Sequence, residues 1–315
     1  MKVLGIETSC DETAAAVVEN GKHILSSVII SSLSYHRRFG GIIPEIAFRK
    51  QLEAISFVVQ EALTKADISY NDIELIAYTQ KPGLIGSLLV GISFAHAIGT
   101  CLNIPCLGVD HIHSHIFSCL IKENPLFPLI ALVVSGGHTS LYYLSGYNRF
   151  KFLGATKDDA CGEAFDKVAK ILNLGYPGGP AIEREARNGN PLRYKFKCSN
   201  TKLPFEFSFS GIKTAVLYET KKYRKIHDQQ KKDICASFQY SIFTVLIKKA
   251  IFAANSYRVK TIVVGGGVAA NNFFRQLFDK ESSRFGLRVV FAPKELCTDN
   301  AAMVAAHGYF KYKKF

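Results

Sequence analysis

Residues 1–30, with the sequence MKVLGIETSCDETAAAVVENGKHILSSVII, decide the fold class. The apolar pattern predicts three strands, at 2–8, 14–19 and 23–30. A polar turn at 9–13 joins the first strand to the second. Asn20-Gly21 between alternating apolar residues is the strongest short-range signal for a hairpin. We therefore expect the chain to open with three consecutive strands.

The same order of elements begins again at residue 128. Pro128 to Val134 form an apolar strand, Ser135 to Thr139 a polar turn and Ser140 to Leu144 a returning strand. Downstream, Lys260 to Val264 precede a glycine loop and a helix, as Glu74 to Thr79 do in the first half. The repetition predicts a duplicated α/β unit.

The length of 315 residues exceeds what one hydrophobic core usually organises, so we expect two lobes with a cleft between them. The first lobe is predicted at 1–126 and the second at 127–298, with an insertion in the second at about 155–232. The last helix, at 299–313, is expected to pack back on the first lobe.

The formal net charge of +13 comes from clustered basic residues. The clusters are Arg193 to Lys197, Lys221 to Lys225, Lys231-Lys232 and Lys311 to Lys314, and all but Lys231-Lys232 contain an interleaved tyrosine or phenylalanine. Such runs suit a nucleic-acid backbone with some base stacking. The alternative is an ordinary solvated surface in a lysine-rich protein.

Eight cysteines are scattered without a C-x-x-C pair, which favours reduced thiols and a cytoplasmic protein over a disulfide framework. No uninterrupted apolar run approaches the roughly 18 residues that span a membrane. Glu7 also interrupts what would be the apolar core of a signal peptide. The sequence therefore predicts no membrane segment.

His111-Ile112-His113-Ser114-His115 follows the apolar stretch 104–109 and has metal-ligand spacing. On a helix, His111 and His115 share one face and His113 points elsewhere. On a strand all three would share a face, but the apolar stripe at 116, 117, 120 and 121 favours the helix. Two imidazoles leave coordination positions open for a catalytic metal. The alternative is a pair of exposed helix histidines.

Three carboxylates are further site candidates. Asp299, in Cys297-Thr298-Asp299-Asn300, is by default the N-cap of the last helix, and its alternative role is a third metal ligand. Asp11 and Glu12 could orient a metal or deprotonate a nucleophile, or Asp11 could form a plain Asx-type turn.

Polar and glycine-rich turns recur at matching positions in the two halves. The turns at 7–13 and 135–139 would direct backbone N–H groups at phosphates, and Gly265 to Asn271 could receive a nucleotide's base and ribose. The alternative for each loop is a tight turn. Gly175 to Pro180 form a rigid turn before Glu183. Phe207 to Thr214 alternate like a strand and lack the first glycine of a phosphate loop.

Ten motifs resemble, in chain order, those of one family. They are Ile6–Thr13, Gly40–Glu45, Pro82–Leu84, His111 with His115, Val134–Thr139, Gly162–Lys167, Tyr176–Pro180, Ser208–Gly211, Gly266–Asn271 and Cys297–Asn300. The family is the bacterial TsaD family, the tRNA threonylcarbamoyladenosine transferases once called O-sialoglycoprotein endopeptidases. The resemblance covers essentially the whole chain.

The resemblance implies an actin-like/sugar-kinase/Hsp70-like (ASKHA) fold of two lobes. It implies transfer of a threonylcarbamoyl group from threonylcarbamoyl-AMP to N6 of adenosine 37 in tRNAs that read codons starting with A. It also implies an inactive TsaB-like paralogue and a small TsaE-like ATPase as partners.

The family's site residues carry over position by position. The implied ligands of one iron or zinc ion are His111, His115 and Asp299. The implied donor-binding positions are Val133, Val134, Ser135, Gly136, Gly137, Asp166, Gly179, Glu183 and Asn271. Asp11 and Glu12 fall on the family's acidic turn and are the expected catalytic pair.

The chain departs from the family pattern at four positions: His113 where glutamate is common, Lys81 for a glycine, Gln51 for a histidine and Glu183 for aspartate.

Two other functions fit the same fold: an ATP-dependent phosphotransferase and a non-catalytic nucleotide-binding subunit. Magnesium kinases prefer oxygen ligands, and a non-catalytic subunit should have lost its metal ligands. A metalloprotease would need a glutamate where Ile112 stands.

Overall fold

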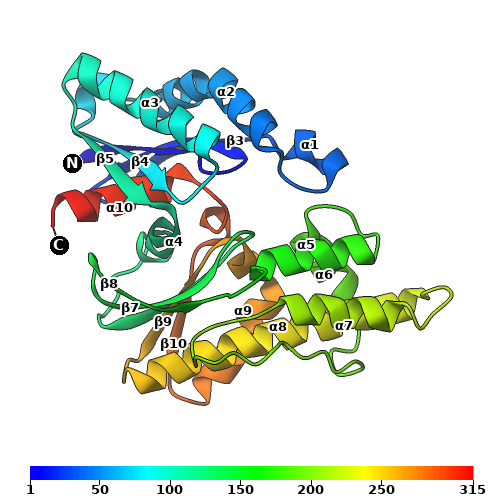
Figure 1. Cartoon of the computed structure of the whole chain (residues 1–315). Helices are drawn as coiled ribbons and strands as arrows, with labels where there is room; N and C mark the ends of the chain where they lie inside the picture. Colours follow the sequence, from blue (N-terminus) through cyan, green and yellow to red (C-terminus); the bar gives the residue numbers. More distant parts are fainter. Residues whose placement is uncertain (315) are drawn as a thin grey trace. The chain divides into compact units, whose positions relative to one another are not determined.

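The computed structural model describes residues 1–314, which divide into two compact α/β units (Figure 1). Unit 1 comprises residues 1–125, 146–148 and 292–314, and unit 2 comprises 126–145 and 149–291. Each unit contains one five-stranded sheet.

Unit 1 contains the N-terminal sheet, the histidine helix and the C-terminal helix. Its elements are β1 (Lys2–Glu7), β2 (Glu12–Glu19), β3 (His23–Ser31), α1 (Leu33–His36), η1 (Arg37–Phe39), α2 (Pro44–Lys65), η2 (Tyr70–Asp72), β4 (Leu75–Lys81), α3 (Ile85–Leu102), β5 (Cys106–Asp110), α4 (His111–Leu120), η5 (Lys294–Leu296) and α10 (Ala301–Tyr312).

The sheet of unit 1 has the strand order β3-β2-β1-β4-β5. β2 is antiparallel to β1 and β3, whereas β4 is parallel to β1 and β5. Asn20 and Gly21 have φ values of 52° and 67°, the left-handed conformation that a tight hairpin turn requires. The predicted hairpin is therefore confirmed.

Unit 2 carries the second sheet and the long insertion. Its elements are β6 (Leu129–Val134), β7 (Thr139–Gly146), β8 (Arg149–Ala155), α5 (Cys161–Ile171), α6 (Gly178–Glu185), η3 (Ala186–Asn188), α7 (Ser210–Thr220), α8 (Asp228–Ser256), β9 (Thr261–Gly265), η4 (Gly267–Ala270), α9 (Asn272–Ser283) and β10 (Arg288–Phe291).

The sheet of unit 2 repeats the order of the first. Its strands lie in the order β10-β9-β6-β7-β8. Counted from the β8 edge, this order matches that of the first sheet, with β6, β7, β8, β9 and β10 in the places of β1, β2, β3, β4 and β5. β6 is antiparallel to β7 and parallel to β9, and β10 is parallel to β9. The predicted duplicated α/β fold is confirmed.

The C-terminal helix α10 packs directly on the sheet of unit 1 through two glycines. A Cβ atom on Gly5 of β1 would lie 2.2 Å from the Ala301 carbonyl oxygen, and one on Gly308 of α10 would lie 2.4 Å from Ala77 Cβ. The helix backbone therefore lies against β1 and β4 with almost no intervening side chain. This close packing positions the residues just before α10 beside unit 1's own strands.

The predicted strand at Phe207 to Thr214 is wrong. Only Phe207 forms a bridge, to Thr156, and α7 begins at Ser210. The Asp158 carboxylate accepts hydrogen bonds from the Phe209 and Ser210 N–H groups and from the hydroxyls of Ser208 and Ser210. These bonds satisfy the first N–H groups of a helix, which alternation of residue types does not reveal.

Two helices, α3 and α8, are long and apolar enough to span a membrane, although the sequence contains no uninterrupted apolar run of that length. Polar residues interrupt both helices, but an 18-residue window of each remains apolar on average. The α8 window is 67% buried, as expected of a core helix of unit 2. The α3 window is only 28% buried, and Ile85 and Leu89 on it are exposed. Length and hydropathy alone are weak evidence for a span.

We expect Gly5→Ala to destabilise unit 1 by about 1–3 kcal/mol, because the added methyl overlaps the backbone of α10. Urea-induced unfolding measures the change. Gly41→Ala is the matched control, since no neighbour among the described parts of the chain lies within 4 Å of a Cβ built there. Equal stabilities for Gly5→Ala and the control would show that α10 does not pack this closely on β1.

Candidate active site

The histidine segment forms the start of a helix, as predicted. β5 ends at Asp110, and α4 begins at His111. Asp110 caps the helix, its carboxylate accepting a hydrogen bond from the His113 N–H at 3.0 Å. His111 and His115 consequently lie one turn apart on one face, with ring centroids 4.8 Å apart.

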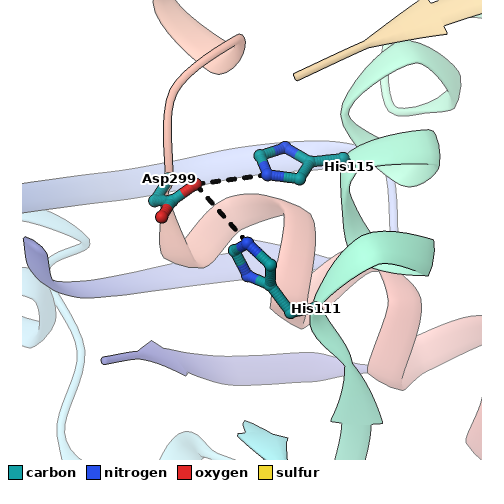
Figure 2. A group of neighbouring side chains, drawn as sticks. All are labelled: His111, His115 and Asp299. Atoms are coloured by element: carbon teal, nitrogen blue, oxygen red, sulfur yellow. Dashed lines mark ion pairs between the residues drawn. The ribbon is translucent and has the colours of Figure 1, made fainter. Parts of the chain in front are cut away.

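Asp299 joins the two histidines (Figure 2). Its Oδ1 lies 3.2 Å from His115 Nε2 and 3.7 Å from His111 Nε2. One ligand atom from each of the three side chains lies within 4.8 Å of the others. All three residues belong to unit 1.

Asp299 is not the helix cap that its position in the sequence suggested. Asn300 is the N-cap of α10, and its Oδ1 accepts a hydrogen bond from the Met303 N–H at 3.0 Å. Asn300 Nδ2 also donates to the carbonyl oxygens of Leu296 and Thr298. Because the neighbour performs the capping, the Asp299 carboxylate can turn toward the histidines.

The three side chains fit a divalent cation. His115 is 1% exposed, and neither ring nitrogen makes a hydrogen bond to any described residue, even though Nε2 lies close to Asp299. Such an unsatisfied buried polar atom calls for a partner. Metal-ligand bonds of about 2.0–2.2 Å in a tetrahedral site place ligand atoms about 3.3 Å apart. The observed separations of 3.2 and 3.7 Å are near this value.

The electrostatic field at the cluster also favours a cation. Burial lowers the pKa of His111, but the carboxylates of Asp299 and Glu7 outweigh it and raise the pKa to about 9. The negative potential around the imidazole is therefore strong enough to hold a positive charge in a buried place.

Glu7 is a buried carboxylate that sequence reasoning missed. Its Oε2 lies 3.1 Å from His111 Nδ1 and accepts a hydrogen bond from Thr79 Oγ1, while its Oε1 accepts one from the Ser9 N–H. A carboxylate on Nδ1 fixes the ring's orientation and leaves Nε2 for a metal. A glutamate at the end of a strand followed by a polar turn was the available signal.

His113 lies outside the ligand group. Its ring centroid is 6.2 Å from that of His307 on α10. Burial lowers the pKa of His113, with Asp110 opposing this effect and Lys311 adding to it. The extra histidine thus belongs to the contact between α4 and α10.

Asp11 lies in the turn between β1 and β2, and Glu12 is the first residue of β2. Hydrogen bonds to the carbonyl groups of this segment hold it in place. Gln51 of α2 is fully buried, and its Nε2 donates to the carbonyls of Thr8, Cys10 and Glu12 at 3.0–3.3 Å. The Ser32 N–H and hydroxyl both donate to the Asp11 carbonyl at 2.9 Å. Gln51, which stands where the family commonly has histidine, therefore holds the acidic turn in place.

The carboxyl group of Glu12 lies in the field of the ligand cluster. Burial raises its pKa well above the ordinary value, and the carboxylates of Asp299 and Asp11 raise it further. The same two carboxylates and burial raise the pKa of the Cys10 thiol. The acidic turn thus accompanies the His-His-Asp group in unit 1 without supplying a ligand to it.

In unit 2, six of the nine predicted donor-binding residues, 133–137 and Asn271, lie at or just after the ends of β6 and β9, and the other three lie on α5 and α6. Val133 pairs with Gly265 in the parallel ladder, so the turn at 135–137 and the loop at 266–271 follow neighbouring strands at one edge. Gly266, with a φ of 94°, brings this loop against Val134, since a Cβ there would lie 2.3 Å from the Val134 carbonyl oxygen. The predicted turns are therefore adjacent.

In this region the backbone is accessible at the glycines, whereas the two valine side chains are buried. Among residues 1–314, no non-adjacent residue comes within 4 Å of a Cβ built on Gly136, Gly137 or Gly179, so a ligand could approach these backbones closely. Ser135 Oγ accepts a hydrogen bond from the His138 N–H and shapes the turn. Val133 and Val134 are buried, so only their backbones could face a ligand.

The polar donor-site candidates also connect helices. Asp166 of α5 accepts a hydrogen bond from the Gly178 N–H at 2.6 Å, and burial raises its pKa to about 6 against that bond. Glu183 of α6 accepts hydrogen bonds from the Asn272 N–H and Nδ2. Asn271 caps α9 by accepting a hydrogen bond from the Phe274 N–H. The longer glutamate thus joins α6 to the start of α9.

The family model described as TsaD, tRNA N6-adenosine threonylcarbamoyltransferase, matches residues 23–306. A Symbiobacterium thermophilum protein with the name tRNA N6-adenosine threonylcarbamoyltransferase is 46% identical over 312 residues, which cover 99% of this chain and 92% of the relative.

Solved structures at low identity show the fold. HypF of T. kodakarensis aligns with 99% of this chain and 48% of its own, with a TM-score of 0.70 and 14% identity. A ROK family glucokinase from Streptomyces griseus aligns over 98% of both chains, with a TM-score of 0.53 and 12% identity. These likenesses confirm the expected actin-like/sugar-kinase/Hsp70-like fold.

The family match covers nearly the whole described chain and agrees with the duplicated sheets and with the ten motifs in order. The relative is similar along nearly its full length as well. The chain therefore belongs to the TsaD family of tRNA N6-adenosine threonylcarbamoyltransferases.

Proposed function

We propose that this chain transfers the threonylcarbamoyl group of threonylcarbamoyl-AMP to N6 of adenosine 37 in tRNAs that read codons starting with A. The observation that carries the proposal is the near-full-length similarity to relatives with the transferase name, combined with a complete His-His-Asp group. A non-catalytic subunit would have no need for such a group.

The proposed metal ligands are His111, His115 and Asp299, which would hold one iron or zinc ion. Imidazole nitrogen and carboxylate oxygen are donors that both metals accept, and three protein ligands leave a position open. When bound, the ion supplies Lewis acidity that polarises a carbonyl group. Glu7 keeps His111 oriented for this role.

The proposed donor-binding residues are Val133, Val134, Ser135, Gly136, Gly137, Asp166, Gly179, Glu183 and Asn271. Support comes from the open backbone at Gly136, Gly137 and Gly179, which leaves room for phosphate and ribose. Asp166 and Glu183 also hold α5, α6 and the start of α9 in place.

The reaction forms a bond between the adenosine nitrogen N6 and the carbamoyl carbon and breaks the bond from that carbon to the AMP phosphate oxygen. AMP leaves with the bonding electrons, and the nitrogen loses one proton. We propose Asp11 and Glu12 as the pair that handles this proton. Burial and the neighbouring carboxylates favour the protonated form of Glu12, which suits a group that holds this proton.

The proposal includes partner proteins and a cytoplasmic location. The TsaB-like paralogue and TsaE-like ATPase implied by the family resemblance need a surface on this chain. Exposed apolar side chains on the neighbouring helices α2 and α3, including Leu52, Phe57, Ile85 and Leu89, offer one that another protein could cover. The tRNA substrate and the reduced cysteines expected from the sequence suit the cytoplasm.

The transfer reaction tests the function. We expect the purified chain with its partner proteins, threonylcarbamoyl-AMP and unmodified tRNA to yield threonylcarbamoyladenosine in nucleoside mass spectrometry. His115→Ala should lower the rate by more than about 100-fold, because it removes a proposed metal ligand. The exposed His23→Ala is the matched control and should keep wild-type activity. Absence of product with partners that support a known transferase would refute the proposal.

Gln51→Ala tests whether the acidic turn must be fastened. Loss of the buried amide leaves three carbonyls without this donor, so we expect a loss of about 1–3 kcal/mol in unfolding free energy and a lower kcat. Gln51→His, which keeps a ring N–H, should recover part of the kcat.

Gln60→Ala, on an exposed position of the same helix, is the control for the Gln51 variants. Urea unfolding and steady-state kinetics give the two readouts. A Gln51→Ala protein with wild-type kcat would show that the turn does not depend on this residue.

A further inference from the structure

The positive charge of the chain is concentrated in one part of unit 2. Residues 187–232 contain twelve lysines and arginines against three aspartates and glutamates, a net charge of +9 out of +13 for the whole chain. A uniformly lysine-rich surface would spread the charge evenly. The concentration therefore needs a local explanation.

Two basic runs in this region meet on the same side of the insertion. The loop at 190–197 is tied to α8, since the Asn190 N–H donates to Asp233 Oδ1 and the Tyr194 N–H to Ser237 Oγ. The Tyr194 hydroxyl lies 3.4 Å from that of Tyr223, in the turn between α7 and α8. Figure 1 shows α7 and α8 side by side, with this turn at one end of the unit.

The loop directs its cations outward and its rings inward. Arg193, Lys195 and Lys197 are exposed, whereas Phe196 between them is buried and stacks with Tyr194 at a centroid distance of 5.9 Å. The packed rings therefore leave Arg193, Lys195 and Lys197 facing solvent.

The turn between α7 and α8 adds three more exposed cations, Lys221, Arg224 and Lys225. Its Lys222 is neutralised by an ion pair with Glu219 at 2.6 Å. Within residues 1–314, the three exposed cations of the loop and the three of the turn form no ion pair. We call these six the basic surface: Arg193, Lys195, Lys197, Lys221, Arg224 and Lys225.

A hollow and an exposed aromatic side chain also lie at or near this turn. An open hollow there is lined by Lys222, Tyr223, Arg224, Lys225, His227 and Gln230. Tyr218 of α7 is 64% exposed and can stack on an unpaired base. Unpaired cations beside an exposed ring suit a nucleic-acid backbone better than a lipid surface, which would need an apolar face as well.

We infer that the basic surface is where the phosphate backbone of tRNA docks on this chain, an inference that rests on the proposed function. The basic loop follows η3 in the chain, and η3 directly follows α6, the helix that carries Gly179 and Glu183. RNA held by the insertion would therefore be attached to the same unit as the proposed donor-binding residues.

The test compares two triple variants: Arg193→Ala with Lys195→Ala and Lys197→Ala, and Lys221→Ala with Arg224→Ala and Lys225→Ala. Fluorescence anisotropy measures the affinity of the full chain for unmodified tRNA across a salt series. Each lost phosphate contact reduces the slope of log affinity against log salt by about 0.7–0.9. We expect each triple variant to bind more weakly and to lose about 2 to 3 from this slope.

A third triple, Lys170→Ala with Lys260→Ala and Lys280→Ala, removes the same charge from exposed positions of unit 2 outside the basic surface. It should bind tRNA as the wild type does. Unchanged affinity and slope in both basic triples would overturn the inference, as would an equal loss in the control triple. Because wild-type transfer is measured separately, a failed docking surface is distinguishable from a failed function.

Discussion

The contact between α10 and the first sheet is the constraint on which the candidate active site depends. Gly5 and Gly308 let the helix backbone lie against β1 and β4. This contact sets the position of Asp299, just ahead of the helix, beside histidines that lie 188 and 184 residues earlier in the chain. Asn300 completes the arrangement by capping α10 itself, so that the Asp299 carboxylate is available to the two imidazoles.

The sequence was sufficient for features that depend on local spacing. The interval between His111 and His115 predicted a shared helical face, and Asn20-Gly21 predicted the hairpin, because both follow from the periodicity of one element. The duplicated sheets were also predictable, since strand and turn patterns repeat. The choice between cap and ligand for Asp299 was not, because it depends on whether Asn300 takes the capping role.

Long-range hydrogen bonds explain the other omissions. Glu7 contacts His111 across 104 residues, and Gln51 reaches the acidic turn from α2. Glu7 stands at the end of a strand before a polar turn, and this local pattern does not identify its partner; Gln51 belongs to no such pattern. The start of α7 was missed for the same reason, because Asp158 supplies its hydrogen bonds from 51 and 52 residues away. In each case a buried or shared polar group decides the structure, and its partner is distant in sequence.

We propose that His111, His115 and Asp299 hold a catalytic metal ion, and quantification of the bound metal tests this assignment. The purified chain should contain about one iron or zinc ion per molecule by elemental mass spectrometry, as three protein ligands with an open position predict. His111→Ala with His115→Ala should contain almost none, while His23→Ala with His227→Ala, at exposed positions, should keep it. Equal metal content in the two double variants, both folded by circular dichroism, would contradict the account.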